Sequence, residues 1–228
     1  MKILYQKFQQ ARPAIIYLLF YLTWFFLIER IPGREYTIIH MKADDKIPFC
    51  EYFIIPYVLW FFYIAWILIY LLFTNYKDYH KCCTFLFTGM TIFLIISTLF
   101  PNIHYLRPSM MPRDNIFTQM VSYLYKIDTS TNLWPSIHVY NSLGVFFAVI
   151  HNERLSSNKW IKSGCFALTT LIILSTVFLK QHSLFDVMTG LIMGAIFYVI
   201  TYHTDLITNL RTKYMNYQKQ REKKTKFN

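Results

Sequence analysis

Long runs of uncharged, mostly apolar residues are the feature that most constrains the fold of this chain. A helix needs about 20 such residues to cross the hydrocarbon core of a bilayer. Apolar residues make up 55% of the sequence and charged residues only 15%, and the charges gather between the runs. The runs cover residues 14–28, 52–76, 82–101, 135–150, 163–179 and 187–204. The sequence therefore predicts six membrane-spanning helices, of which the first is somewhat short.

No second domain is indicated, so we expect residues 1–228 to form one all-α, polytopic membrane bundle of six transmembrane helices. The connection at residues 102–133 is the one long stretch without a spanning pattern. Connections of that length are usually functional or disordered. Its middle, residues 116–125, predicts a short amphipathic helix that lies on the membrane surface between the third and fourth spans.

The net charge of +11 would by itself suit a nucleic-acid-binding protein. The basic residues instead stand at the ends of the apolar runs, and their densest cluster is in the tail, residues 205–228. We expect this tail to contact anionic lipid headgroups in the cytoplasm, and we do not expect nucleic acid as a partner. The four cysteines show neither metal-ligand spacing nor a pairing pattern. The oligomeric state is left open.

The distribution of basic residues predicts how the chain is oriented in the membrane. Six spans put both termini on one side, and fifteen of the 23 Lys and Arg residues fall on that side. Cytoplasmic loops carry an excess of Lys and Arg, so the termini are predicted to be cytoplasmic. The outer face then receives six polar residues that we consider together: Arg107, Arg113, His138, Lys180, His182 and Asp186.

Two histidines and an aspartate among these residues suggest acid–base and nucleophilic chemistry. His182 and Asp186 are four residues apart, which places them on one face of a helix. The carboxylate can hold one imidazole nitrogen and leave the other free to attack phosphorus, while His138 protonates the departing oxygen. These three residues are therefore the candidate catalytic residues.

The cations on the same face favour an anionic ligand. Arg107, Arg113 and Lys180 can stabilise charge on a phosphoryl group, so the chemistry requires neither a metal ion nor another cofactor. Two alternatives remain at this point. In the first, the two histidines and the aspartate are ligands of a metal ion, although the neighbouring cations would repel it. In the second, the histidines are polar residues at helix starts that only satisfy local hydrogen bonds.

Three short motifs resemble those of the type 2 phosphatidic-acid phosphatase superfamily of membrane lipid phosphatases. The first, Lys-x6-Arg-Pro, matches at Arg107-Pro108, with Phe100 in the place of its lysine. The second, Pro-Ser-Gly-His, matches at residues 135–138, with Ile137 in the place of its glycine. The third, Ser-Arg-x5-His-x3-Asp, matches at residues 175–186, with Thr176 in the place of its arginine. Two cations of the usual pattern are therefore missing.

The resemblance covers about residues 44–190 and is greatest to the branch that contains inositol phosphorylceramide synthases. The stretch Asp45-x-Ile-Pro-Phe, followed by Pro56-Tyr57-x-x-Trp60, also resembles that branch. The resemblance implies a six-helix bundle with its site near the outer interface. It also implies metal-independent hydrolysis or transfer of a phosphoryl group on a lipid phosphate.

The resemblance implies one role for each matching residue. His182 would be the nucleophile that carries the phosphoryl group, Asp186 would orient it, and His138 would be the acid and base. Arg107 and Ser136 would bind phosphate, and Arg113 and Lys180 are the nearest cations that would replace the missing ones. The sequence leaves open which lipid is used, whether water or an alcohol is the acceptor, and whether the chain is an inactive relative that binds lipid phosphate.

Overall fold

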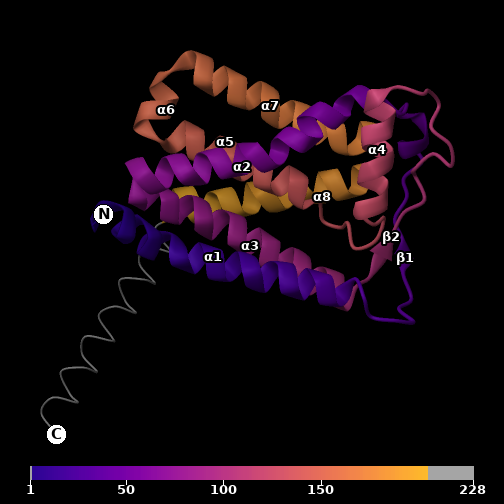
Figure 1. Cartoon of the computed structure of the whole chain (residues 1–228), viewed down its shortest axis with the longest axis horizontal. Coiled ribbons are helices and arrows are strands. Elements are labelled where there is room, and N and C mark those ends of the chain that lie inside the picture. The colour runs from indigo at the N-terminus through magenta and orange to yellow at the C-terminus, as the bar shows by residue number, and fades with distance from the viewer. Residues whose placement is uncertain (1, 205–228) are drawn as a thin grey trace, which may run out of the picture.

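The computed structural model describes residues 2–204, and helices dominate it, as the sequence predicts. The long helices run back and forth along one axis, each antiparallel to the next in the chain (Figure 1). They are α1 (Lys2–Ile28), α2 (Ile54–Thr74), α3 (Tyr76–Leu99), α5 (Ile137–His151), α7 (Lys159–Phe178) and α8 (Leu184–Tyr198), which a π-helical segment (Val199–His203) continues. The basic tail, residues 205–228, lies outside the described residues.

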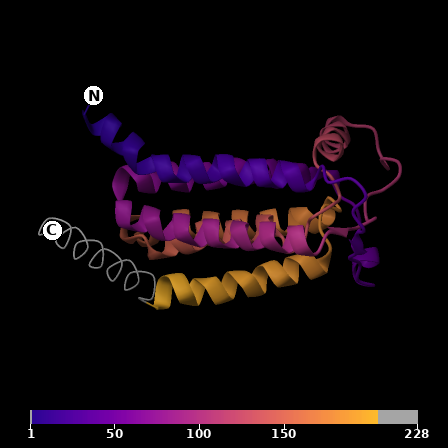
Figure 2. The same cartoon turned by 90° about the horizontal axis from the view of Figure 1, so that it is seen from below.

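Short elements gather at one end of this bundle. They include two 3-10 turns, Asp44–Lys46 and Glu51–Phe53, and the crosswise helix α4 (Ile116–Ile127). Strand β1 (Thr37–Ile38) pairs in parallel with β2 (Asn102–Ile103), a pairing that two-residue strands give no sequence pattern to predict. The first turn of α1 and the π-helical segment lie at the opposite end (Figure 2).

Within residues 2–204, five helices are long and apolar enough to cross a membrane, by length and composition. The first is longer than its apolar run, because the helix begins at Lys2 and includes the polar residues before residue 14. The fourth predicted span, residues 135–150, forms α5, which has only 15 residues and falls short of that length. The residues described therefore confirm a helical bundle with five candidate spans, and not the count of six.

Two boundaries differ from the apolar runs because polar residues can begin a helix. Only Asn75 separates α2 from α3, and its side chain accepts hydrogen bonds from the backbone N–H groups of Lys77 and Asp78. Such a cap satisfies donors that the first turn of a helix leaves unpaired. The charged residues 77–81 therefore belong to the first turns of α3 rather than to a loop. The short helix α6 (Glu153–Ser157) similarly begins at a capping Asn152.

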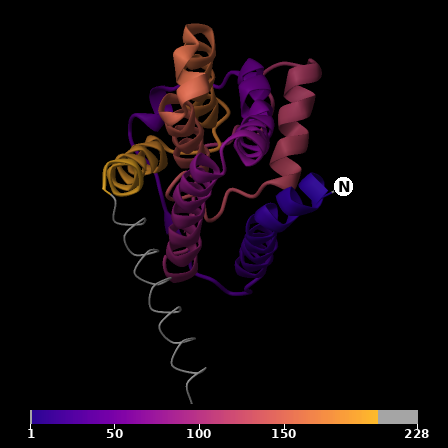
Figure 3. The same cartoon turned by 90° about the vertical axis from the view of Figure 1, so that its left-hand side faces the viewer.

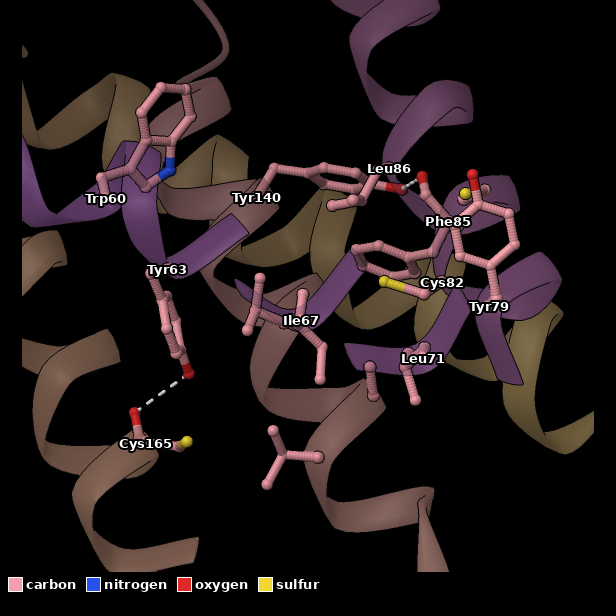
Figure 4. Close-up of a cluster of buried hydrophobic side chains, with 14 of the residues drawn as sticks. Trp60, Tyr63, Ile67, Leu71, Tyr79, Cys82, Phe85, Leu86, Tyr140 and Cys165 are labelled. Atoms are coloured by element: carbon pink, nitrogen blue, oxygen red, sulfur yellow. Dashed lines mark hydrogen bonds between the residues drawn. The ribbon is translucent and has the colours of Figure 1, made fainter. Parts of the chain in front are cut away.

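Helix α5 is at the centre of the bundle, where it packs against α2, α3, α7 and α8. The ring of Tyr140 stacks on Phe85 with a centroid distance of 4.4 Å, and its hydroxyl donates to the Phe85 carbonyl at 2.8 Å. Tyr63 of α2 donates to the carbonyl of Cys165 on α7 (Figure 4). Buried hydroxyls thus find acceptors on neighbouring helices. Helix α1 is at the edge, beside α3 (Figure 3).

Candidate active site

The start of α8 is built by a reciprocal cap that fixes the aspartate of the third motif. Ser183 is the N-cap residue, and its hydroxyl accepts a hydrogen bond from the backbone N–H of Phe185 at 3.2 Å. Asp186 accepts a hydrogen bond from the backbone N–H of Ser183 at 2.9 Å. This arrangement is a capping box with an aspartate in the usual place of glutamate. It leaves the buried Asp186 carboxylate pointing back toward His182.

His138, His182 and Asp186 form a hydrogen-bonded row. His182 Nδ1 lies 3.3 Å from Asp186 Oδ2, and His182 Nε2 lies 3.2 Å from His138 Nδ1. An ionised carboxylate only accepts hydrogen bonds, so we assign a proton to His182 Nδ1. His182 Nε2 then carries a lone pair, and His138 Nδ1–H is its donor. The structure brings together the three residues that the sequence singled out.

The side chains of His138, His182 and Asp186 do not point at one common position. The two nitrogens of His182 lie on opposite edges of its ring, one facing Asp186 and the other facing His138. A single metal ion would need the three side chains to point at the same position. In the part of the chain that the structure describes, no group of three or more His, Cys, Asp or Glu side chains is arranged to hold a metal ion.

Close packing between α5 and α8 brings His138 to His182. The backbone N–H of Ser136, the N-cap residue of α5, donates to the Asp186 carbonyl at 3.2 Å. A Cβ added to Gly190 would lie 2.9 Å from the Ser136 carbonyl oxygen, so only glycine allows this approach. The Ser136 hydroxyl accepts a hydrogen bond from the Val139 N–H at 3.4 Å and is fully buried. Ser136 therefore helps to start α5 beside α8.

Two aromatic residues of α2 hold the imidazole of His138. The ring of Tyr57 lies 4.7 Å from it, and the ring of Trp60 lies 4.3 Å from it, measured between centroids. Residues three apart lie on the same face of a helix, so both rings reach the same histidine. The sequence marked this Tyr-x-x-Trp pair only as part of a resemblance. The structure shows that the pair contacts the candidate acid and base.

Asp44 is a site residue that the sequence reasoning missed. Its carboxylate is buried and accepts hydrogen bonds from the Ser183 hydroxyl at 2.6 Å and from the Leu184 N–H at 2.8 Å. It also accepts from the backbone N–H of Met41 at 2.8 Å. Asp44 therefore holds the turn that follows His182. The only signal in the sequence was its place beside the Asp45-x-Ile-Pro-Phe stretch.

Arg107 lies beside the same turn, but its guanidinium is held by the protein. It donates to the carbonyls of Asp128 at 2.9 Å and Thr129 at 2.8 Å, and to the side chain of Gln181. Its guanidinium carbon lies 4.5 Å from the centre of the Tyr125 ring. Burial lowers the pKa of Arg107, but a guanidinium stays charged at neutral pH. Arg107 thus supplies a fixed positive charge, and it is linked to His182 through the neighbouring residue Gln181.

His104 is a second residue that the sequence did not reveal. It is 1% exposed, and its Nε2 donates to the Gln181 carbonyl at 2.8 Å. Its Nδ1 accepts a hydrogen bond from the Leu106 N–H at 3.3 Å. Burial lowers the pKa of His104, which keeps the imidazole neutral. A lone histidine in a long connection carries no spacing signal that would have predicted this contact.

The two other candidate cations are engaged by the protein. Arg113 makes a bidentate ion pair with the buried carboxylate of Glu51, with both N–O distances at 2.7 Å. The ammonium of Lys180 donates to the Asp44 carbonyl at 2.7 Å, and burial lowers its pKa. Arg113 and Lys180 are therefore both close to the turn-forming segments, Glu51–Phe53 and Asp44–Lys46.

The positions where cations are missing have other structural roles. Phe100 is 61% exposed at the end of α3. Thr176 is fully buried, and its carbonyl accepts hydrogen bonds from the backbone N–H groups of Gln181 and His182. Its hydroxyl donates to the Ile173 carbonyl at 2.7 Å. Thr176 therefore shapes the turn that carries His182.

A mostly apolar cavity of about 1100 Å³ opens beside the row. Apolar side chains of α1, α2, α3 and α4 line most of it, and His138, His182 and Asp128 are among its polar residues. The lining residues of α2 extend from Ile54 to Leu72, which is about 27 Å along a helix axis. Burial raises the pKa of Asp128, whose carboxylate accepts a hydrogen bond from Tyr57 at 3.2 Å. The cavity can hold a long hydrocarbon chain with a polar group at the histidines.

Comparison with known families finds a match to the PAP2 superfamily over residues 106–207. The matched segment includes Arg107, Ser136, His138, His182 and Asp186. Comparison with curated proteins gives no significant match, and comparison with solved structures gives none either. The match supports the superfamily that the motifs predict, and it suggests phosphatase or phosphotransferase activity on lipid phosphates in an integral membrane protein.

Proposed function

We propose that this chain is a metal-independent lipid phosphatase or phosphotransferase that works through a phosphohistidine at His182. The observation that carries the proposal is the row His138–His182–Asp186 at the side of a long apolar cavity. A lipid phosphate needs both parts, an apolar space for its chain and a polar group that reacts with its phosphate. The match to the PAP2 superfamily favours the same chemistry.

The proposed reaction has two steps. His182 Nε2 attacks the phosphorus, a P–N bond forms, the P–O bond to the lipid breaks, and His138 protonates the departing lipid oxygen. Water or an alcohol then attacks the phosphorus and gives its proton to His138, while the P–N bond breaks. Asp186 holds His182 in the required tautomer and stabilises the charge that develops on its ring.

The phosphate-binding set is proposed to be Arg107 and Ser136, with Arg113 and Lys180 in place of the missing cations. Of the four, Arg107 is expected to contribute most to phosphate binding, because its guanidinium already donates to Gln181, the neighbour of His182. Arg113 and Lys180 would have to exchange their present partners, Glu51 and the Asp44 carbonyl, for phosphate oxygens.

A phosphotransferase of the inositol phosphorylceramide synthase-like branch is the alternative reaction on the same row. The Tyr57-x-x-Trp60 pair favours it, because this stretch resembles that branch and contacts His138. A lipid-phosphate-binding relative without activity is a third candidate. It is favoured by Phe100 and Thr176, which stand where the superfamily has cations.

The proposal includes a placement in the membrane. We take α5 as a sixth span despite its 15 residues, because it is surrounded by the longer helices. Helix α4 would lie on the outer membrane surface, the site would face outward, and both termini would be cytoplasmic. The basic tail would contact anionic lipids. The lipid phosphate is the expected partner, and nucleic acid is not.

The proposal is tested by phosphate release from a panel of lipid phosphates, in detergent with a chelator present. We expect release by the unmodified chain and at least a thousandfold loss in both His182→Ala and His138→Ala, because each removes a group that acts directly on the phosphoryl transfer. Thermal unfolding of each variant checks that the bundle remains intact. Full activity of His182→Ala would refute the mechanism.

The same panel separates the alternatives. Adding a lipid alcohol distinguishes transfer from hydrolysis, because transfer produces a new phosphorylated lipid. Binding of lipid phosphate with no release and no transfer would identify an inactive relative. Activity that disappears with chelator and returns with added metal would revive the metal-ligand interpretation of the two histidines and the aspartate.

A further inference from the structure

One carboxyl group at the cavity has no role in the proposed reaction. Asp128, the C-cap residue of α4, lines this cavity together with His138 and His182. Its side chain is only partly buried, so the carboxyl group is open to whatever enters the cavity. A charge beside apolar walls is poorly solvated. The charge of Asp128 therefore depends on the groups around it, including a bound ligand.

Two hydrogen bonds connect Asp128 to residues that contact or adjoin the histidines. Its Oδ2 accepts from the Tyr57 hydroxyl at 3.2 Å, and the Tyr57 ring lies 4.7 Å from the His138 ring, measured between centroids. Oδ2 also accepts, at 3.5 Å, from the side chain of Gln181, the neighbour of His182. Asp128 is near enough to His182 for a positive charge there to favour the ionised carboxylate. A negatively charged phosphoryl group at His182 would act on Asp128 in the opposite sense.

The site has little positive charge to balance an additional anion. Arg107 is a cation near Asp128, and it donates to the backbone carbonyl of this residue rather than to its carboxylate. Arg113 and Lys180 already have partners in the protein, and two cations of the superfamily motifs are absent. Repulsion between two negative charges is stronger in an apolar cavity than in water. A lipid phosphate and an ionised Asp128 therefore disfavour each other in this cavity.

The ionisable groups around Asp128 come from several segments of the chain. Burial raises the pKa of Asp128 above its ordinary value, and Arg107 and a protonated His182 oppose this rise without cancelling it. Glu29 adds to the rise. A bound phosphate would raise the pKa further, since an anion favours the neutral carboxyl group. The groups that face Asp128 or share its cavity are Tyr21, Glu29, Tyr57, Arg107, His138 and His182.

We infer that Asp128 takes up a proton when the phosphate of a lipid binds beside His182, and that this proton supplies charge balance that the missing motif cations do not. The inference rests on the proposed function and deepens it, because it states which charge form of the site binds the substrate. The step is balanced, since one carboxylate and one proton from water give one neutral carboxyl group, and no bond of the lipid changes. Asp128 acts through its charge and is not a catalytic residue.

Proton uptake gives the sign of the pH dependence. Binding consumes a proton, so the affinity for a lipid phosphate falls as the pH rises through the range in which Asp128 is ionised in the free chain and neutral in the complex. At lower pH, Asp128 is already neutral before the lipid binds. The affinity then no longer changes with the ionisation of this residue.

The test measures binding and proton uptake without turnover. The probe is the monomethyl ester of hexadecylphosphonate, which keeps a single negative charge at neutral pH and joins phosphorus to its hydrocarbon chain by a P–C bond. Titration calorimetry with the chain in nanodiscs of zwitterionic lipid, in buffers of different ionisation enthalpy, gives the dissociation constant and the protons taken up. We expect uptake approaching one proton per probe, and a dissociation constant that rises by up to about tenfold per pH unit between about pH 5 and about pH 8.

Asp128→Asn assigns the proton, because asparagine is neutral, similar in size and resembles the protonated carboxyl group. We expect this variant to bind the probe without proton uptake, and at about pH 8 at least about tenfold more tightly than the unmodified chain. The control is Asp114→Asn, which removes an exposed carboxylate from the same connection that does not line the cavity. This control should keep the proton uptake and the pH dependence.

The outcomes separate this inference from the proposed function. Proton uptake that persists in Asp128→Asn would assign the proton to another group, such as a histidine, and would overturn the inference. Binding to the unmodified chain without proton uptake would also overturn it, as would weaker binding to Asp128→Asn at every pH. Phosphate release is measured separately on lipid phosphates. Uptake by Asp128 without any release would refute the reaction and leave the inference standing, whereas release without uptake would support the reaction and overturn the inference.

Discussion

At the scale of single residues, His104 shows how a side chain remote in sequence can support the candidate nucleophile. Its neutral ring donates to the Gln181 carbonyl and accepts from the Leu106 N–H, so a second ring proton would face a donor. The titratable groups around it include Arg107, His182 and Asp186. Protonation of His104 would therefore disturb the turn that carries His182 as well as the fold.

This arrangement predicts a pH dependence of stability. The pKa of His104 is lowered by burial below its usual value of 6.5, so the unfolded chain takes up the proton first as the pH falls. The contribution of His104 is complete above about pH 6.5 and is lost as the pH falls through the lower pKa of the folded chain. We expect the Tm in detergent to fall between about pH 7.5 and about pH 5, and to fall less in His104→Gln.

The control for this prediction is His40→Gln, because His40 is an exposed histidine paired with Asp45 outside the site. It should keep the pH dependence of the unmodified chain. An identical decline of Tm in His104→Gln and in the unmodified chain would show that other groups cause the acid sensitivity.

At the scale of elements, the site depends on how closely α5 and α8 approach. The reciprocal cap of Ser183 and Asp186 starts α8, and the N–H of Ser136 ties the start of α5 to the Asp186 carbonyl. Gly190 permits this contact because it has no side chain between the two helices. The distance between His138 and His182 is therefore set by helix packing rather than by either helix alone.

Adding one methyl group tests this contact. Gly190→Ala would place a Cβ 2.9 Å from the Ser136 carbonyl oxygen and 3.2 Å from the Val139 side chain. We expect the free energy of unfolding to fall by about 1–3 kcal/mol, as in other overpacked interiors, and kcat to fall as the histidines separate. The measurements are denaturation in mixed micelles and the phosphate-release assay.

Gly164→Ala on α7 is the matched control, because a Cβ there would meet nothing within 4 Å. It should leave kcat unchanged and raise the free energy of unfolding by about 0.5–1 kcal/mol, since alanine is a better helix former than glycine. Equal effects of the two substitutions would refute the importance of the α5–α8 contact.

At the scale of the whole molecule, the edge position of α1 creates the cavity. Helix α1 packs mainly on α3, and the space toward α2 and α4 is left to the cavity of about 1100 Å³. Many large apolar side chains of α1 and α2 are exposed outside the bundle, as expected for surfaces that face lipid rather than water. The hydrocarbon chain of a lipid inside the cavity would therefore be surrounded by apolar groups, as it is in the bilayer.

Filling this cavity should affect long-chain substrates selectively. Ala65 of α2 lines the cavity, so Ala65→Trp would occupy part of it. We expect kcat/KM for a long-chain lipid phosphate to fall by about tenfold, mostly through KM, and that for a short water-soluble phosphate to change little. Phe62→Trp is the control, because Phe62 is 67% exposed on the same helix and does not line the cavity. Equal losses of kcat/KM for both substrates would contradict the placement of the lipid's hydrocarbon chain in this cavity.

The orientation of the bundle is tested by labelling single cysteines in a background that carries Cys50→Ser, since the other three cysteines are buried. Met110 is 82% exposed at the site end, and Trp160 is 87% exposed at the opposite end. The excess of basic residues at the opposite end predicts that it faces the cytoplasm. In intact cells, an impermeant maleimide should therefore label Met110→Cys and not Trp160→Cys. The reverse pattern would invert the proposed topology.

Features that depend on local composition and spacing could be predicted from the sequence. Apolar runs predicted where the helices lie, and residues 116–125 predicted the helix that became α4. The four-residue spacing of His182 and Asp186 predicted their contact, and the motifs predicted that His138 would join them. Runs measure hydrophobicity rather than helix length, which is why α1 begins earlier than its run and α5 is shorter than a full span.

The residues that complete the site from far along the chain could be identified only from the packing of the helices. The Ser183 hydroxyl meets the carboxylate of Asp44, 139 residues earlier, and the His104 ring meets the carbonyl of Gln181, 77 residues later. Tyr57 and Trp60 reach His138 because α2 packs on α5, and Arg113 is held by Glu51 across the end of the bundle. Such contacts follow from how the helices pack, and neither local periodicity nor residue spacing records that packing.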